Sequence, residues 1–163
     1  MNLTRDQLFE LAQTALIRMD GAWFIAVANQ FGKDAAWKTD VAAWSQFSYV
    51  MGKNMRGRIS TEPRWPDDFI DVLEAILTIM KTDGRSITVN GEIITVRVTD
   101  CETQKAITKA GIADCGIATK AVYRGLARGL FGKDFEVNVS HTKNLNRGDD
   151  CCEVILSLSS GKP

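Results

Sequence analysis

Three cysteines and the only histidine are the side chains in this sequence best suited to do chemistry together. The chain of 163 residues holds four cysteines and one histidine: Cys101, Cys115, Cys151, Cys152 and His141. Thiolate sulfur and imidazole nitrogen are ligands that Zn²⁺ binds tetrahedrally, and a thiolate beside an imidazole base can act as a nucleophile. A free cysteine can also be a small buried hydrophobe. No Cys-x-x-Cys pair is present to decide among these three interpretations.

Two alternating segments predict that His141 and Cys152 are neighbours. Residues 135–141 and 152–158 alternate apolar side chains with others, and the polar residues 144–150 between them are typical of a hairpin turn. His141 is in phase with Val139, and Cys152 is in phase with Val154. We therefore expect His141 and Cys152 to lie opposite each other on the core-facing side of the sheet.

The connection between the strand over 93–98 and the strand over 135–141 brings Cys101 and Cys115 to the end of the sheet where His141 and Cys152 are expected. A strand over 93–98 ends just before Cys101, and a helix that begins at Asp114 or Cys115 and ends at Phe131 returns the chain. A helix of about 15 residues spans roughly 22 Å, which matches a strand of seven or eight residues. The sequence therefore predicts a metal site, with zinc preferred over iron and Cys151 as a substitute ligand, formed by Cys101, Cys115, His141 and Cys152.

The first half of the chain is predicted to be helical. Thr4 and Gln7 have the capping-box pattern, and the helix that follows either stops near Asp20 or continues to Phe31. Asp34 is a suitable N-cap for a helix over residues 35–55. After a loop, a helix with a continuous apolar stripe begins at Pro66-Asp67, with inward positions at Phe69, Val72, Leu73, Ile76, Leu77 and Met80.

The second half is predicted to be a sheet with helices. Asn90-Gly91 separates segments 87–89 and 93–98, and as the central pair of a type I′ turn both residues would have positive φ. The segment 101–110 is predicted to be a short helix. The fold class is thus α+β, with N-terminal helices packed on a mainly antiparallel sheet of about four strands and a crossover helix. We expect one domain over residues 1–163, with a helical layer at 1–83 and a sheet layer at 84–163.

Composition narrows the classes of function. Twenty basic residues balance twenty acidic ones, so there is no net charge to attract nucleic acid or an anionic membrane surface. No apolar run reaches the roughly 18 residues of a membrane span, and the N-terminal residues do not have the pattern of a secretory signal. We therefore expect a cytoplasmic protein with reduced thiols, without a nucleic-acid or membrane partner.

Several short motifs resemble a known family. They are Asp20-Gly21-Ala22-Trp23-Phe24, Phe31-Gly32, Ala36, Trp44, Cys101-Glu102-Thr103-Gln104, Gly111, Cys115, Tyr123 and Cys152-Glu153. Together they resemble a bacterial and archaeal family of unassigned function that is grouped with L-2-amino-thiazoline-4-carboxylic acid hydrolase-like proteins. The C-terminal half is also similar to the four-vinyl-reductase type of small-molecule-binding domain, a fold shared more distantly with haem-nitric-oxide-binding domains and Golgi-transport subunits.

The resemblance implies an α+β fold, often dimeric, with a ligand cavity between sheet and helices. It also implies that the cysteines at 101, 115 and 152 recur in relatives, where metal binding is a reasonable inference. The segment His141-Thr142-Lys143 departs from the family where a further cysteine is expected. We therefore expect a homodimeric small-molecule-binding domain of sensor type with a Cys/His metal site. The alternatives are a hydrolase that opens a small nitrogen- or sulfur-containing ring and a structural dimerisation module.

Overall fold

The computed structural model describes residues 2–59 and 61–159, which form helices followed by a sheet with two more helices. The helices are α1 (Arg5–Phe31), α2 (Lys33–Arg56), α3 (Asp67–Ile79), α4 (Glu102–Lys109), α5 (Gly116–Phe131) and the short 3₁₀ helix η1 (Leu145–Arg147). The strands are β1 (Arg85–Asn90), β2 (Ile93–Val98), β3 (Val137–Lys143) and β4 (Cys152–Leu158). This arrangement confirms the predicted α+β class.

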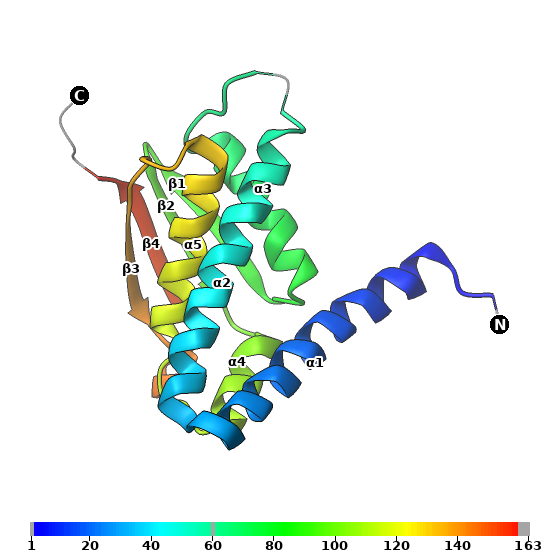
Figure 1. The fold of residues 1–163 in the computed structure, drawn as a ribbon. Coiled ribbons are helices and arrows are strands. Elements are labelled where there is room, and N and C mark those ends of the chain that lie inside the picture. Colours follow the sequence, from blue (N-terminus) through cyan, green and yellow to red (C-terminus); the bar gives the residue numbers. More distant parts are fainter. Residues whose placement is uncertain (1, 60, 160–163) are drawn as a thin grey trace.

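Helix α1 is continuous over its whole length. The predicted capping box is present: the Gln7 N–H donates to Thr4 Oγ1 at 3.2 Å, and the Thr4 N–H donates to the Gln7 side chain at 3.0 Å. The helix runs through Gly21 without a break, which settles the open choice in favour of the longer helix. It ends at Phe31, and the next residue, Gly32, is its C-cap, with a φ of 86° that suits a residue without a side chain. Figure 1 shows that the N-terminal part of α1 leads away from the rest of the molecule.

Helix α2 begins earlier than the sequence predicted. Its first residue is Lys33 and its N-cap is Gly32, so the prediction of Asp34 as N-cap is wrong. Asp34 lies in the first turn instead, where its negative charge is favourable near the positive end of the helix dipole. Helix α3 begins at the predicted place, after Pro66, and buries the predicted apolar stripe.

Helices α2 and α5 pack closely because glycines face each other between them. A Cβ atom on Gly129 would lie 2.2 Å from the carbonyl oxygen of Tyr49 and 2.9 Å from the Cα atom of Gly52. The two backbones therefore approach more closely than any side chain at Gly129 would allow. This contact fixes α5 against α2 and so fixes where Cys115, at the start of α5, must lie.

The strands form one antiparallel sheet in the order β1-β2-β4-β3. The β1–β2 hairpin is as predicted, but its turn is not: Asn90 is still paired with Ile93, and the two turn residues are Gly91 and Glu92. Of Asn90, Gly91 and Glu92, only Gly91 has a positive φ, 61°. This pattern fits a type II′ turn, which needs glycine at its first central position, rather than the expected type I′ turn.

Strands β3 and β4 pair as predicted, but their register differs from the prediction. His141 lies opposite Val154, and an irregularity between His141 and Lys143 shifts the pairing by one residue. Cys152 pairs with Val98 of β2 instead. The predicted parity is correct, because Val139 and Val154 are buried on the same face as His141 and Cys152. Helices α2 and α5 lie over this face of the sheet (Figure 1).

One core joins the helices to the sheet. Its fully buried side chains include Phe69, Leu73, Ile94, Leu126, Leu130 and Leu156, which come from α3, α5, β2 and β4. Among the described residues no helix is both long enough and apolar enough to cross a membrane.

Candidate functional site

Two adjoining cavities lie among the helices, and the first of them also reaches the sheet. The first, which we call the sheet cavity, has a volume of about 130 Å³ and is walled by α2, α3, β2, α4, α5 and β4. The second, the helix cavity, has a volume of about 530 Å³ and is walled mainly by α1, α2 and α4. Four residues line both cavities: Asp40, Met80, Thr103 and Ile107.

The structure brings the three predicted cysteines together at the sheet cavity. Cys101, Cys115 and Cys152 all line it, alongside apolar side chains such as Val98 and Val122. Cys101 is the N-cap of α4 and accepts a hydrogen bond from the Gln104 N–H at 3.4 Å. Burial raises the pKa of the Cys101 thiol. The topological reasoning from the sequence therefore located these thiols correctly relative to one another.

Cys115 and Cys152 form an unequal pair. The Cys115 thiol has two acceptors within reach, the Cys152 sulfur and, at 3.5 Å, Asn144 Oδ1. Donation to Cys152, together with burial, strongly raises the pKa of the Cys115 thiol. The same hydrogen bond lowers the pKa of the Cys152 thiol to about 5, and the neighbouring His141 and the Leu145 N–H, 3.5 Å from the sulfur, lower it further. The opposite directions of these pKa shifts favour a thiolate on Cys152 rather than on Cys115.

His141 lies beside this pair but has no well-formed hydrogen bond. Both of its ring nitrogens are buried, and neither has a well-aligned partner among the described residues. A Cβ atom on Gly116 would lie 3.0 Å from His141 Nδ1, which places the imidazole against the first turn of α5. His141 does not line either cavity, unlike the three cysteines. Its effect is on the Cys152 sulfur rather than on a ligand in the cavity.

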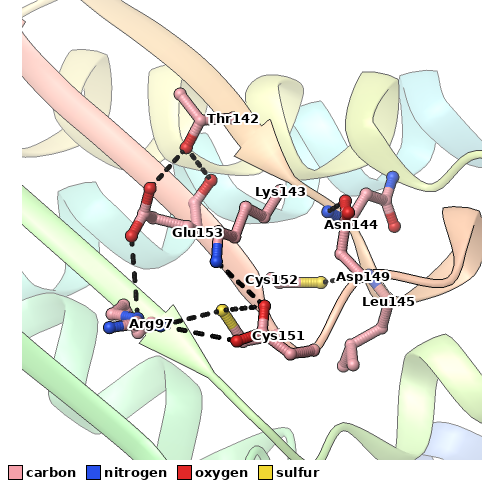
Figure 2. Close-up of polar contacts among 10 residues, drawn as sticks. Arg97, Thr142, Lys143, Asn144, Leu145, Asp149, Cys151, Cys152 and Glu153 are labelled. Atoms are coloured by element: carbon pink, nitrogen blue, oxygen red, sulfur yellow. Dashed lines mark hydrogen bonds and ion pairs between the residues drawn. The ribbon is translucent and has the colours of Figure 1, made fainter.

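Cys151 lies outside the site although it precedes Cys152. Figure 2 shows its sulfur directed toward Arg97, whereas the Cys152 sulfur is directed toward Leu145. The Arg97 guanidinium donates to the Cys151 sulfur at 3.5 Å and contacts Glu153 at 3.6 Å. Lys143 and Asp150 extend this group of charges, because the Lys143 ammonium lies 3.0 Å from an Asp150 carboxylate oxygen. The alternation of a strand thus separates the two adjacent cysteines.

The predicted zinc site stays a prediction. Over residues 2–59 and 61–159, no group of three or more His, Cys, Asp or Glu side chains is arranged so that it could hold a metal ion. Asp114, which like His141 lies against Gly116, already has hydrogen-bond donors: its oxygens accept from the Gly116 N–H at 2.7 Å, from Asn144 Nδ2 at 2.7 Å and from Arg147. Although burial opposes them, these donors lower the pKa of Asp114.

Sequence reasoning missed a pair of carboxyl groups. Asp20 of α1 and Asp40 of α2 lie within hydrogen-bond distance, and Asp20 also accepts from the Trp44 indole. Burial and the neighbouring Asp20 raise the pKa of Asp40 to about 7, and burial raises the pKa of Asp20. A signal was available in the sequence, because Asp40 stands at helical spacing between Ala36 and Trp44 on the inward face of α2.

A comparison with protein-family models identifies the family. The model of a family of unknown function, DUF6125, matches residues 1–137. The chain belongs to this family. A search of curated protein sequences finds no match. This agrees with the expected membership of a family without an assigned function, while the comparisons show no link to aminothiazoline carboxylate hydrolases or to vinyl reductases.

Two solved structures are similar to this chain in fold. One is a trafficking protein particle complex subunit 3 from Naegleria fowleri, covalently bound to palmitic acid, with a TM-score of 0.59, 14% identity, and 93% of this chain and 97% of that chain covered. Another is the phenol-responsive sensory domain of the transcription activator PoxR with phenol, with a TM-score of 0.58, 8% identity, and 90% and 74% covered. At these identities the likeness shows the fold.

Proposed function

We propose that this chain is a small-molecule-binding domain of sensor type, whose ligand lies between the helices and the sheet. The observation that carries the proposal is a pair of adjoining cavities: one of about 130 Å³ between the helices and the sheet, and one of about 530 Å³ walled mainly by α1, α2 and α4. Ligand pockets usually measure about 300–1,000 Å³.

The chemistry of the walls indicates a largely apolar ligand. Aliphatic and aromatic side chains such as Val98, Val122 and Phe47 form most of the sheet cavity. A dry apolar cavity of about 150 Å³ is known to take up benzene, so the sheet cavity has room for a single small ring or a short chain. Two proteins of the same fold, one with phenol and one with palmitic acid, support an organic ligand here.

A cavity-filling substitution tests this proposal. Ala118 of α5 lines the sheet cavity, and Ala118→Leu would put three more carbon atoms into it. Ala121, one turn further along α5, lines neither cavity, so Ala121→Leu is the matched control. The probe is the uncharged fluorophore N-phenyl-1-naphthylamine, whose emission rises in apolar surroundings. It is larger than the sheet cavity, so we expect its phenyl ring to occupy the sheet cavity and its naphthalene to extend into the adjoining helix cavity.

We expect the wild type and Ala121→Leu to bind the fluorophore and Ala118→Leu to bind it at least tenfold more weakly. Thermal unfolding of each variant shows whether the fold is kept. Filling an empty space without strain should leave the unfolding temperature of Ala118→Leu unchanged or higher. Equal binding by both variants, or no binding by the wild type, would exclude a ligand site in the sheet cavity.

We also propose that two copies associate through α1. Large apolar side chains are exposed along this helix, including Leu8 at 51%, Met19 at 71% and Ile25 at 59%. Exposed apolar surface of this kind commonly marks an interface. Light scattering after size-exclusion chromatography should give twice the chain mass for the wild type and the single-chain mass for Met19→Glu. A single-chain mass for the wild type at about 100 μM would contradict the dimer.

A further inference from the structure

The junction between the two cavities holds buried oxygen atoms that have no hydrogen-bond partner. Asp40 and Thr103 are the two polar side chains among the four residues that line both cavities. Asp40 is only 4% exposed, and its Oδ1 atom has no partner among the described residues. The Thr103 hydroxyl, which comes from α4 on the other side of the junction, is buried and unpartnered as well.

Buried oxygen atoms without a hydrogen-bond partner are rare in folded proteins, and a bound ligand is one way to satisfy them. Buried polar groups are almost always hydrogen-bonded, because leaving one unpaired forfeits its hydration without replacement. Here two separate elements, α2 and α4, each present an unpaired oxygen to the same space. A ligand group that donates hydrogen bonds at the junction would satisfy both of them.

The junction also carries negative charge. Asp40 lies within hydrogen-bond distance of Asp20, a contact that needs one proton shared between the two carboxyl groups. A pair of carboxyl groups that shares one proton carries one negative charge, and most of the other side chains around this space are apolar. The Trp44 indole, which donates to Asp20, is a neutral donor and does not compensate this charge.

Within the described part of the chain, no basic side chain makes an ion pair with either carboxyl group. Arg18 and Lys109 line the helix cavity, but neither forms an ion pair with Asp20 or Asp40. A buried charge is normally paired. A cationic ligand group would supply the partner that this part of the chain does not.

We propose that the junction is a recognition site for a protonated amine carried on an apolar body, held by Asp20, Asp40 and Thr103. This inference rests on the proposed function, because the apolar body occupies the cavities. An ammonium group has three N–H donors, enough for both carboxyl groups and the Thr103 hydroxyl. A ligand hydroxyl offers one donor and no charge, and a ligand carboxylate would be repelled.

Three ligands of equal chain length separate these chemistries: n-octylamine, n-octanol and octanoate, each competing with N-phenyl-1-naphthylamine for the wild-type protein at about pH 7. We expect octylamine to displace the fluorophore at a concentration at least tenfold lower than octanol, since hydrogen bonds to charged groups are the stronger ones. Octanoate should be the weakest competitor.

Two substitutions show whether the junction is responsible for this preference. Asp40→Asn keeps the shape of the side chain and removes its charge, and it should bring octylamine to within threefold of octanol. Asp34→Asn makes the same change at an exposed position in the first turn of α2 and should leave the preference intact. Thr103→Val, which replaces a hydroxyl by a methyl group, should weaken octylamine several-fold and provides the test if Asp40→Asn does not fold.

The outcomes distinguish this inference from the proposed function. If all three ligands compete equally, or if the amine preference survives both Asp40→Asn and Thr103→Val, the cavity binds ligands but the amine site is wrong. Stronger competition by octanol or octanoate than by octylamine would also show that the amine site is wrong. If no ligand competes and the fluorophore itself does not bind, the proposed function fails and the amine site fails with it.

Discussion

Replacing Asp40 by asparagine should remove a defined part of the pH dependence of stability. The pKa of Asp40 is raised from 3.8 to about 7 by burial and by the charge of Asp20. Between these two pH values the folded chain binds one proton more than the unfolded chain, so the free energy of unfolding falls as the pH rises. The slope is about 1.4 kcal/mol per pH unit, so a change from about pH 5.5 to 7 costs roughly 2 kcal/mol.

A second group opposes this trend and must be separated from it. The pKa of Cys152 is lowered from 9.0 to about 5, so over that interval the unfolded chain binds more protons and stability rises with pH. The useful quantity is therefore the difference in the free energy of unfolding between the wild type and Asp40→Asn at each pH. Cys152 contributes equally to both proteins and cancels in this difference.

The assay is urea unfolding followed by tryptophan fluorescence at several pH values. The wild type should lose roughly 2 kcal/mol relative to Asp40→Asn between about pH 5.5 and 7, and Asp34→Asn should run parallel to the wild type. A difference that stays constant over this range would show that Asp40 is ionised normally in the folded chain. The account of a proton shared between Asp20 and Asp40 would then be refuted.

Three further predictions concern the packing, the thiols and the metal. Gly129→Ala should lower the free energy of unfolding by about 1–3 kcal/mol, because the added Cβ would lie 2.2 Å from the Tyr49 carbonyl oxygen. The control Gly21→Ala, whose Cβ would have no atom within 4 Å, should raise the free energy of unfolding by up to ~1 kcal/mol. If urea unfolding shows similar effects for both variants, the close α2–α5 contact is contradicted. The rate of alkylation by iodoacetamide, measured against pH, should rise with a midpoint near pH 5. This rise should be absent in Cys152→Ser, and its midpoint should move to higher pH in Cys115→Ala. An unchanged midpoint in Cys115→Ala would show that Cys115 does not donate to Cys152. The zinc site predicted from the sequence requires close to one zinc per chain in elemental analysis of untagged protein, reduced in Cys101→Ala; less than a tenth of an equivalent would exclude it.

The sequence was sufficient for the elements and for the meeting of the thiols. Cys101, Cys115 and Cys152 stand at helix N-caps or at the start of a strand, where the topology alone determines which end of the sheet they share. Helix and strand lengths set that topology, and both can be read from periodicity. For this reason long-range placement was predicted correctly while the exact pairing of His141 was not.

What escaped prediction depends on local geometry between elements. The irregularity between His141 and Lys143 shifts the register by one residue, and no residue type in that segment predicts such a shift. The Asp20–Asp40 contact depends on how α1 packs against α2, because the two residues lie on different helices. The sequence pattern around each aspartate does not show that the two carboxyl groups meet. The size and position of a cavity depend on how all the elements around it pack together, so periodicity within single elements does not predict them.

The most direct test of the account is to locate a bound molecule by NMR. In protein with labelled valine, leucine and isoleucine methyl groups, bound N-phenyl-1-naphthylamine should give nuclear Overhauser contacts to Val98, Val122 and Val154, which line the sheet cavity. Contacts confined to exposed methyl groups such as those of Leu8, Leu11 and Ile117 would place the molecule on the surface and contradict a ligand site between helices and sheet.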